Sequence, residues 1–150
     1  MAIFTEKVQY TRGNGIVVRP NVSVAGIHFG ESPWRFSALY GRTITGYAVE
    51  NPDSKFIRWY SSLIDCLSID NEVVGFEFIG DDSVLTTFIF DSHDCRLGTD
   101  YDLRNLKAVI PDLKYTGKSE IYIAKESSIE VRTRGTKLLY MGIYKEGYFK

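Results

Sequence analysis

The run Asp91-Ser92-His93-Asp94-Cys95 gathers an imidazole, two carboxylates and a thiol within the 150-residue sequence. These side-chain types can coordinate a metal ion or transfer protons. Neighbouring residues of a strand or turn point in different directions, however, whereas a metal site needs three or four converging ligands. The only other histidine is His28. We therefore interpret the run as a polar loop, and we expect no metal or other cofactor.

No other motif in the sequence specifies a reaction. A cysteine nucleophile would require Cys66 or Cys95 to meet a histidine, and no flanking signature supports such a pair. The segment Thr116-Gly117-Lys118-Ser119 ends like a phosphate-binding loop, but Asp112 stands where the first glycine is required. The sequence therefore predicts no catalytic residue.

Charge is distributed unevenly along the chain, although the net charge is only −1. Residues 1–49 carry five basic and two acidic side chains, and residues 106–150 carry nine and five. Residues 50–105 carry twelve acids against four bases, so the three segments sum to +3, −8 and +4. The negative electrostatic field of these clustered acidic side chains would attract a basic partner or a cation. The alternative is that folding interleaves this segment with the basic flanks, which would leave a mixed surface.

The main functional prediction is a non-enzymatic binding protein whose acidic segment docks onto a basic protein. Small immunity-type proteins act in this way when they occlude a nucleic-acid-degrading toxin, and the comparison is an analogy of size and charge. A sequence pI near 6.1 argues against nucleic acid as the main partner. The predicted partner-binding residues are acidic: Glu72, Glu77, Asp81, Asp82, Asp91, Asp94, Asp100 and Asp102.

The alternative prediction is a small-molecule or carbohydrate site in the mouth of an aromatic-rich sheet, with hydrolysis left open. Trp34 is the best single candidate for an exposed aromatic that stacks on a ligand, because it lies in a predicted loop after Gly30. His28 and His93 are the candidate polar groups. Further aromatic side chains of such a site would be Tyr40, Tyr47 and Phe76.

Two helices are predicted. Asn51-Pro52-Asp53 resembles a helix start, and apolar residues from Phe56 to Leu67 recur at helical spacing, so we predict a helix over 52–67 with Phe56, Trp59 and Leu63 in the core. Thr99 and Asp102 approximate a capping box before Leu103, Leu106 and Ile110, which predicts a second helix over about 100–110 that Pro111 ends.

The remaining segments are predicted to be strands. The slip in apolar phase near Ala25-Gly26 indicates a β-bulge within a strand over 22–29. Residues 35–40 form a short strand, and 72–79 pairs with 84–91 as a hairpin. A closing meander follows residue 120, in which Glu126 and Glu130 pair with the basic residues around Arg132.

These elements predict one domain, residues 1–150, of the α+β class: a predominantly antiparallel, curved sheet partly covered by two helices. A β-sandwich or barrel with helical insertions is the alternative. No apolar run approaches the roughly 18 residues of a membrane helix. The first residues do not resemble a secretory signal, so we expect a cytoplasmic protein with two reduced cysteines. The sequence leaves the oligomeric state open.

Overall fold

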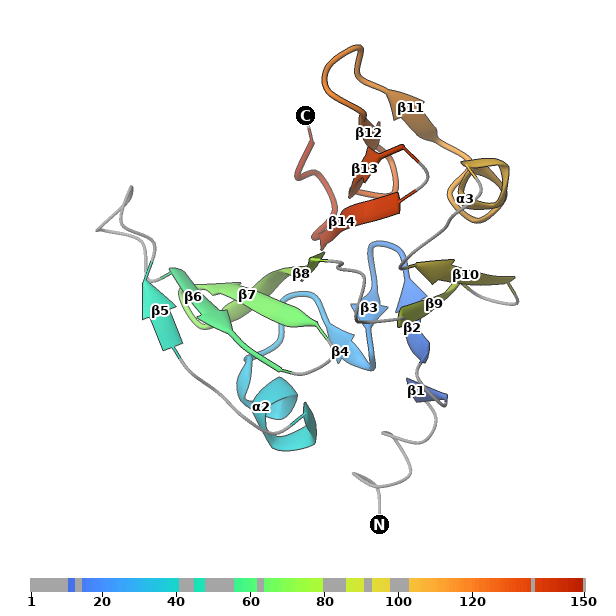
Figure 1. Ribbon diagram of the computed structural model, residues 1–150. Helices are drawn as coiled ribbons and strands as arrows, with labels where there is room; N and C mark the ends of the chain where they lie inside the picture. The colour runs from blue at the N-terminus through green and yellow to red at the C-terminus, as the bar shows by residue number, and fades with distance from the viewer. Residues whose placement is uncertain are drawn as a thin grey trace.

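Most of the described chain is β-strand (Figure 1). The structure is a computed structural model that describes residues 11–12, 15–40, 45–47, 56–61, 64–79, 86–90, 93–97, 103–135 and 137–149. Its helices are α2 (Trp34–Tyr40) and α3 (Leu103–Val109). One sheet contains β1 (Thr11–Arg12), β2 (Gly15–Arg19), β3 (Ser23–Val24), β4 (Ile27–His28), β9 (Thr86–Phe90) and β10 (His93–Leu97). The other contains β5 (Thr45–Tyr47), β6 (Phe56–Trp59), β7 (Asp65–Ile69), β8 (Glu72–Ile79), β11 (Leu113–Tyr115), β12 (Ile121–Ala124), β13 (Ile129–Arg134) and β14 (Lys137–Tyr144).

The two sheets differ in how their strands connect. The eight-stranded sheet has the order β11-β12-β13-β14-β8-β7-β6-β5 and is antiparallel throughout. The six-stranded sheet has the order β10-β9-β2-β3-β4, with β1 also beside β2, and its β2 and β9 are parallel. The described strands do not close into a barrel. The fold is therefore mostly β, with two sheets and two short helices.

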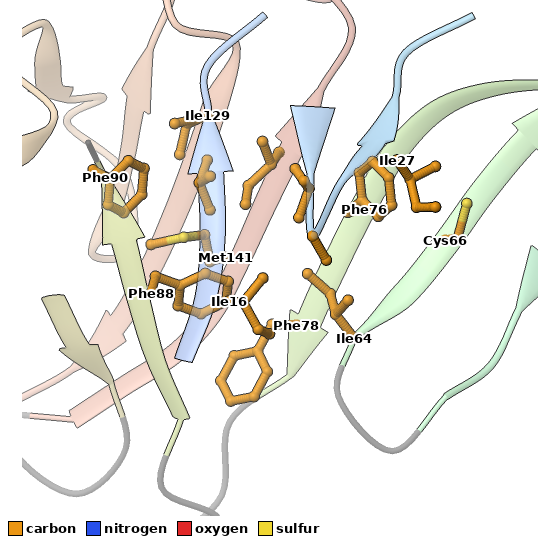
Figure 2. Packing of buried hydrophobic residues seen from close by; sticks show 14 of the residues in the cluster. Ile16, Ile27, Ile64, Cys66, Phe76, Phe78, Phe88, Phe90, Ile129 and Met141 are labelled. Atoms are coloured by element: carbon orange, nitrogen blue, oxygen red, sulfur yellow. The ribbon is translucent and has the colours of Figure 1, made fainter. Parts of the chain in front are cut away.

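The core lies between the two sheets. Figure 2 shows Ile16 and Phe88 of the six-stranded sheet meeting Met141 of the eight-stranded sheet, and all three side chains are fully buried. Phe78 and Phe88 meet edge to face across the same interface, with ring centroids 5.5 Å apart. Burial of these aromatic and aliphatic side chains is the main force that holds the sheets together.

The helix predicted over 52–67 is wrong. Phe56–Trp59 and Asp65–Ile69 are the antiparallel strands β6 and β7, and residues 51–55 lie outside the described part. The apolar spacing that suggested one helical face belongs to two separate strands, between which the Ser61 hydroxyl donates to the carbonyl of Ile64 at 2.7 Å. Leu63, also predicted for the core, lies outside the described part. Trp59 is buried as expected, whereas Phe56 is only half-buried.

The hairpin predicted between 72–79 and 84–91 is also wrong. Both segments contain strands, but β8 pairs with β7 and β14, whereas β9 pairs with β10 and β2. Consecutive strands thus belong to different sheets. Their phenylalanines face the shared core from opposite sides, which is why both arms show the same alternation in sequence.

Residues 35–40 are helical, not extended. Helix α2 begins after Ser32-Pro33, and the backbone N–H of Ser37 donates to the carbonyl of Pro33 at 3.2 Å. Proline at the first position of a helix needs no donor. Phe36, Leu39 and Tyr40 form its buried face. The second predicted helix is confirmed over Leu103–Val109, with its earlier residues outside the described part.

The bulge predicted at Ala25-Gly26 is a tight hairpin turn. Val24 pairs with Ile27, which leaves Ala25 and Gly26 as a two-residue loop with φ of 53° and 82°. Two positive φ values are typical of the type I′ turn that joins antiparallel strands. The closing meander is confirmed, since β12, β13 and β14 pair in sequence order. No described helix is long and apolar enough to span a bilayer.

Candidate functional site

The predicted acidic residues are only partly within the described structure. Glu72 is exposed at the start of β8, and Glu77 lies further along the same strand. Asp94 belongs to β10, of which only the backbone is described. The other predicted partner-binding residues lie outside the described residues: Asp81, Asp82, Asp91, Asp100 and Asp102.

Glu72 and Glu77 share the face of the eight-stranded sheet that points away from the core, here called the outer face. A regular strand would place these two residues on opposite faces. Val73 pairs with Ser68 and Gly75 with Leu67, so Val74 is an extra residue in β8. This bulge shifts the alternation of side chains and returns Glu72 to the face that carries Glu77.

The carboxylate of Glu77 is held by three donors from two other strands. The guanidinium of Arg58 and the hydroxyl of Tyr140 both donate to it, and the hydroxyl of Tyr144 donates to Oε2 at 3.1 Å. The Glu77 side chain is only 15% exposed. Burial opposes ionisation of this carboxyl, but the hydrogen bonds from Tyr140 and Arg58 and the charge of Arg58 outweigh it, so the pKa of Glu77 lies below its ordinary value.

The two tyrosine rings lie over the sheet because β14 has a glycine between them. A Cβ atom at Gly142 would come within 2.6 Å of both the Tyr140 hydroxyl and Cε2 of Tyr144. The tyrosine hydroxyls also lie in contact with each other, so the single proton of one phenol is shared between Glu77 and the other hydroxyl. Burial is the largest cause that raises the pKa of both phenols, and the Glu77 carboxylate raises both as well; the Tyr140 hydroxyl raises the pKa of Tyr144, whereas the Tyr144 hydroxyl lowers that of Tyr140. The cluster of Arg58, Glu77, Tyr140 and Tyr144 is therefore internally satisfied, and Glu77 is not a free docking charge.

Arg58 also binds a second carboxylate. Its Nη1 lies 3.2 Å from Oδ2 of Asp65 on β7. Burial raises the pKa of Asp65 and outweighs the opposing effect of Arg58. The helix predicted over 52–67 contained both Arg58 and Asp65, so this cluster was not among the predicted sites. The pairing of β6, β7 and β8 is what brings them to one face.

The other ion pairs among the described residues join residues that are close in sequence. Arg35 bonds the carboxylate of Glu31 through Nε and Nη2, both at 3.0 Å, and lowers the pKa of Glu31 against the effect of burial. Arg132 bonds Glu130 and lies over the ring of Tyr140, 4.7 Å from its centroid. The sequence predicts cross-strand pairing for the basic residues here, but Arg132 pairs with Glu130 two residues earlier on the same strand, β13, and no described ion pair involves Glu126.

The acidic segment presents two exposed carboxylates on the turn between β7 and β8. Asp70 and Asn71 form this turn with φ of 50° and 67°, and Glu72 follows it. Asp70 and Glu72 are both exposed, and no ion pair joins either one to another described residue. We call Asp70 and Glu72 the acidic turn.

The two histidines do not form a joint site. His28 lies on β4 and His93 on β10, which are opposite edges of the six-stranded sheet. Four strand spacings of about 4.8 Å separate them. His28 is exposed, with Nδ1 3.5 Å from Glu31. His93, Asp94 and Cys95 lie on strand β10, so the loop predicted there is wrong from His93 onward.

Cys66 is a buried free thiol on β7. Burial, together with the negative charges of Glu31 and Asp65, raises its pKa, so the thiol stays protonated. A protonated, inaccessible sulfur is a poor nucleophile and a poor metal ligand. Among the described residues, no three histidine, cysteine or acidic side chains are grouped as a metal site would require.

The aromatic residues proposed for the alternative site separate into two classes. Phe76 is fully buried, and Tyr40 is buried with its hydroxyl donating to the carbonyl of Ala25. Both belong to the core, and the side chain of Tyr47 lies outside the described part. Trp34 is different, since it is 63% exposed at the first position of α2.

Trp34 rests on a second tryptophan that is itself fixed. The two indoles meet edge to face with centroids 5.0 Å apart. Trp59 is buried, and its indole N–H donates to the hydroxyl of Ser68 at 2.9 Å. Trp34 is thus an exposed ring on a rigid support. No protein-family model, curated protein or solved structure matches this chain.

Proposed function

We propose that this protein binds a basic protein partner without catalysing a reaction, as a small immunity-type protein does when it neutralises a toxin such as a nuclease. The acidic segment 50–105 supplies the negative charge. The observation that carries the proposal is the local pairing of the arginines: Arg35 and Arg132 bind carboxylates of their own segments, and Arg58 is shared by two acids. Among the described residues, Asp70 and Glu72 of the acidic segment are exposed and join no ion pair, which supports their availability to a partner.

The acidic turn is the described part of this docking surface. Its carboxylates are exposed at the end of a hairpin, so they can approach a partner without unfolding the sheet. Opposite potentials across an interface accelerate encounter and select the partner. We also propose a cytoplasmic location, which the composition and the free thiol of Cys66 support.

Affinity capture tests the proposal. The wild-type chain is the bait in a lysate of the native cell at about 50 and 500 mM salt, because exposed charges are screened within a few ångströms at the higher concentration. The test variant is Asp70→Asn/Glu72→Lys, which keeps a residue at position 70 that tolerates positive φ. The matched control is Glu126→Gln/Glu146→Lys, with the same charge change on two exposed acids outside the segment.

The expected result is a basic protein that the wild type and the control capture at low salt, and that the test variant and high salt release. The captured protein is then purified and its inhibition by the wild-type chain is measured. Equal capture by the test variant and the control would remove the acidic turn from the interface. A captured protein that is acidic would overturn the proposal.

A further inference from the structure

Neither described helix covers the outer face of the eight-stranded sheet. Phe36 of α2 and Leu106 of α3 both belong to the buried core, so the two helices pack on the other side of this sheet. The outer face nevertheless carries exposed apolar side chains. Ile69 is one of them, because it lies directly opposite Glu72 across β7 and β8. Apolar side chains on an uncovered face are a feature of protein–protein contact surfaces.

One corner of the outer face is acidic. Glu72 is exposed there, beside the turn between β7 and β8. Asp65 and Glu77 lie opposite each other on the same two strands, and both bind the single guanidinium of Arg58. We call these four residues the acidic corner. Its three carboxylates and one guanidinium sum to a net charge of −2.

A second group on the same face is basic. The odd-numbered residues of β13 are buried toward the core, so Glu130, Arg132 and Arg134 point outward. Lys114 joins them through the cross-strand row Lys114–Ile123–Glu130. Arg132 and Glu130 neutralise each other, whereas no ion pair joins Lys114 or Arg134 to another described residue. Lys114 and Arg134, here called the basic corner, therefore leave a net charge of +2.

The two corners lie diagonally across the face. In the strand order, β11 and β13 are on one side of β14, whereas β8, β7 and β6 are on the other. Gly75 of β8 pairs with Tyr144, so Glu72 lies toward the C-terminal end of β14. Arg134 pairs with Lys137 at the opposite end of that strand. The corners are thus separated both across the strands and along them.

An exposed tyrosine lies between the two corners. The chain turns at Gly147, with φ of 86°, and lays the ring of Tyr148 flat on Tyr144 of β14 with centroids 4.0 Å apart. Phe149 meets both rings edge to face. Tyr144 is buried by these contacts, whereas Tyr148 is 58% exposed. Exposed tyrosines near the centre of a surface are frequent anchors of interfaces.

We propose that two copies of this chain associate through their outer faces, about a two-fold axis that crosses the face between the two corners. The acidic corner of each copy then meets the basic corner of the other, and the Tyr148 rings of both copies lie near the axis. A two-fold interface must be self-complementary, with both halves of each contact on one surface. The charges of −2 and +2 meet this requirement, whereas a partner of one sign would be repelled by one corner.

This association goes beyond the proposed function. A basic partner needs only the acidic turn at the end of β7 and β8. Glu72 belongs to both surfaces, so the partner and the second copy compete for it. Failure of self-association would leave the capture of a basic protein unaffected.

Sedimentation velocity of the wild-type chain measures the association over an about hundredfold range of protein concentration, because dimer formation depends on protomer concentration. A dimer is expected at about 50 mM salt, and about 500 mM salt should shift it toward monomer by screening the charges. Tyr148→Ala should weaken the dimer by about tenfold or more, whereas Tyr148→Phe keeps the ring and should retain most of the affinity.

Charge reversal identifies the face. Glu72→Lys and Arg134→Glu should each be monomeric, since each places like charges together at both contacts. An equimolar mixture of the two should dimerise again, because every contact then pairs opposite charges. The matched controls are Glu126→Lys and Lys107→Glu, which reverse exposed charges on the loop after β12 and on α3, and both should dimerise as the wild type does. Thermal melts confirm that each variant is folded.

Each outcome decides the proposal. Recovery of the dimer in the mixture, with both controls unchanged, supports the outer-face interface. A wild type that stays monomeric at low salt and high concentration overturns it. So does a dimer that Glu72→Lys and Arg134→Glu leave intact, or a mixture of these variants that remains monomeric.

Discussion

Replacing Glu77 by glutamine should destabilise the fold by about 1–3 kcal/mol at neutral pH. The carboxylate accepts hydrogen bonds from Arg58 through Oε1 and from Tyr140 and Tyr144 through Oε2. Glutamine keeps the shape but presents a neutral carbonyl on one side and an NH₂ donor on the other. Hydrogen bonds to a charged group contribute about 1.5–3 kcal/mol, against about 0.5–1.5 kcal/mol for neutral ones. Arg58 retains Asp65, which limits the loss.

The pH dependence of this loss follows from the sign of the pKa shift. The folded pKa of Glu77 is below its ordinary value of 4.5, so its contribution is fully present above about pH 4.5 and is lost as the pH falls through the folded pKa. The stability difference between wild type and Glu77→Gln should therefore shrink in acid. Asp65 acts in the opposite direction, because burial raises its pKa and its ionised form is disfavoured in the fold.

Urea unfolding of both proteins at pH 7 and at pH 3 measures the difference. Glu72→Gln is the matched control, since it removes the same charge from an exposed site on the same strand and should change stability by less than about 0.5 kcal/mol. A Glu77→Gln protein as stable as Glu72→Gln at pH 7 would refute the cluster. A difference that is constant between the two pH values would refute the ionic part of the argument.

Three further outcomes are expected. Gly142→Ala should cost about 1–3 kcal/mol in urea unfolding, since its Cβ would meet the rings of Tyr140 and Tyr144, and an unchanged midpoint would contradict this packing. Cys66 should resist alkylation in the folded protein and react once it is unfolded, as peptide mass spectrometry can show, and rapid native labelling would contradict its burial. Ser128→Ala should be neutral or stabilising by up to about 1 kcal/mol, because the buried hydroxyl has no hydrogen-bond partner among the described residues; a loss of stability in the melt would show that it does.

Local alternation predicted most of the strands correctly. In β13, Ile129, Val131 and Thr133 are buried while Arg132 and Arg134 are exposed, as the alternating sequence indicated. The predicted strand over 72–79 is β8. These strands could be predicted from the sequence because the alternation of side chains along a strand depends only on neighbouring residues.

The sequence did not predict which strands pair with one another. The segments that contain Phe76 and Phe88 have the composition expected of the two arms of a hairpin. Their strands, β8 and β9, nevertheless belong to different sheets. Which strands pair depends on contacts between residues far apart in sequence, and alternation is the same in either arrangement. The helix predicted over 52–67 was wrong for a related reason: the apolar residues of the two short consecutive strands β6 and β7 fall at the spacing of one helical face.

The sequence contained a usable signal for α2 that was overlooked. Ser32-Pro33 is a good helix start, and Phe36, Leu39 and Tyr40 have the spacing of one helical face. Trp34 was selected as an exposed aromatic, and its exposure is confirmed although it begins a helix instead of lying in a loop. The support from Trp59 could not be foreseen, because it depends on how α2 packs against β6.

Local strand order also explains the ion pairs of the described residues. β5 to β8 follow one another both in sequence and across the sheet, so Arg58 meets carboxylates of its own segment, whereas Glu130 and Arg132 lie two residues apart on one strand, β13. Antiparallel neighbours joined by short turns keep residues that are close in sequence close in space. Among the described residues, Arg35 and Arg132 therefore pair with Glu31 and Glu130 of the flanks, whereas no ion pair joins Asp70 or Glu72 of the acidic segment to another described residue.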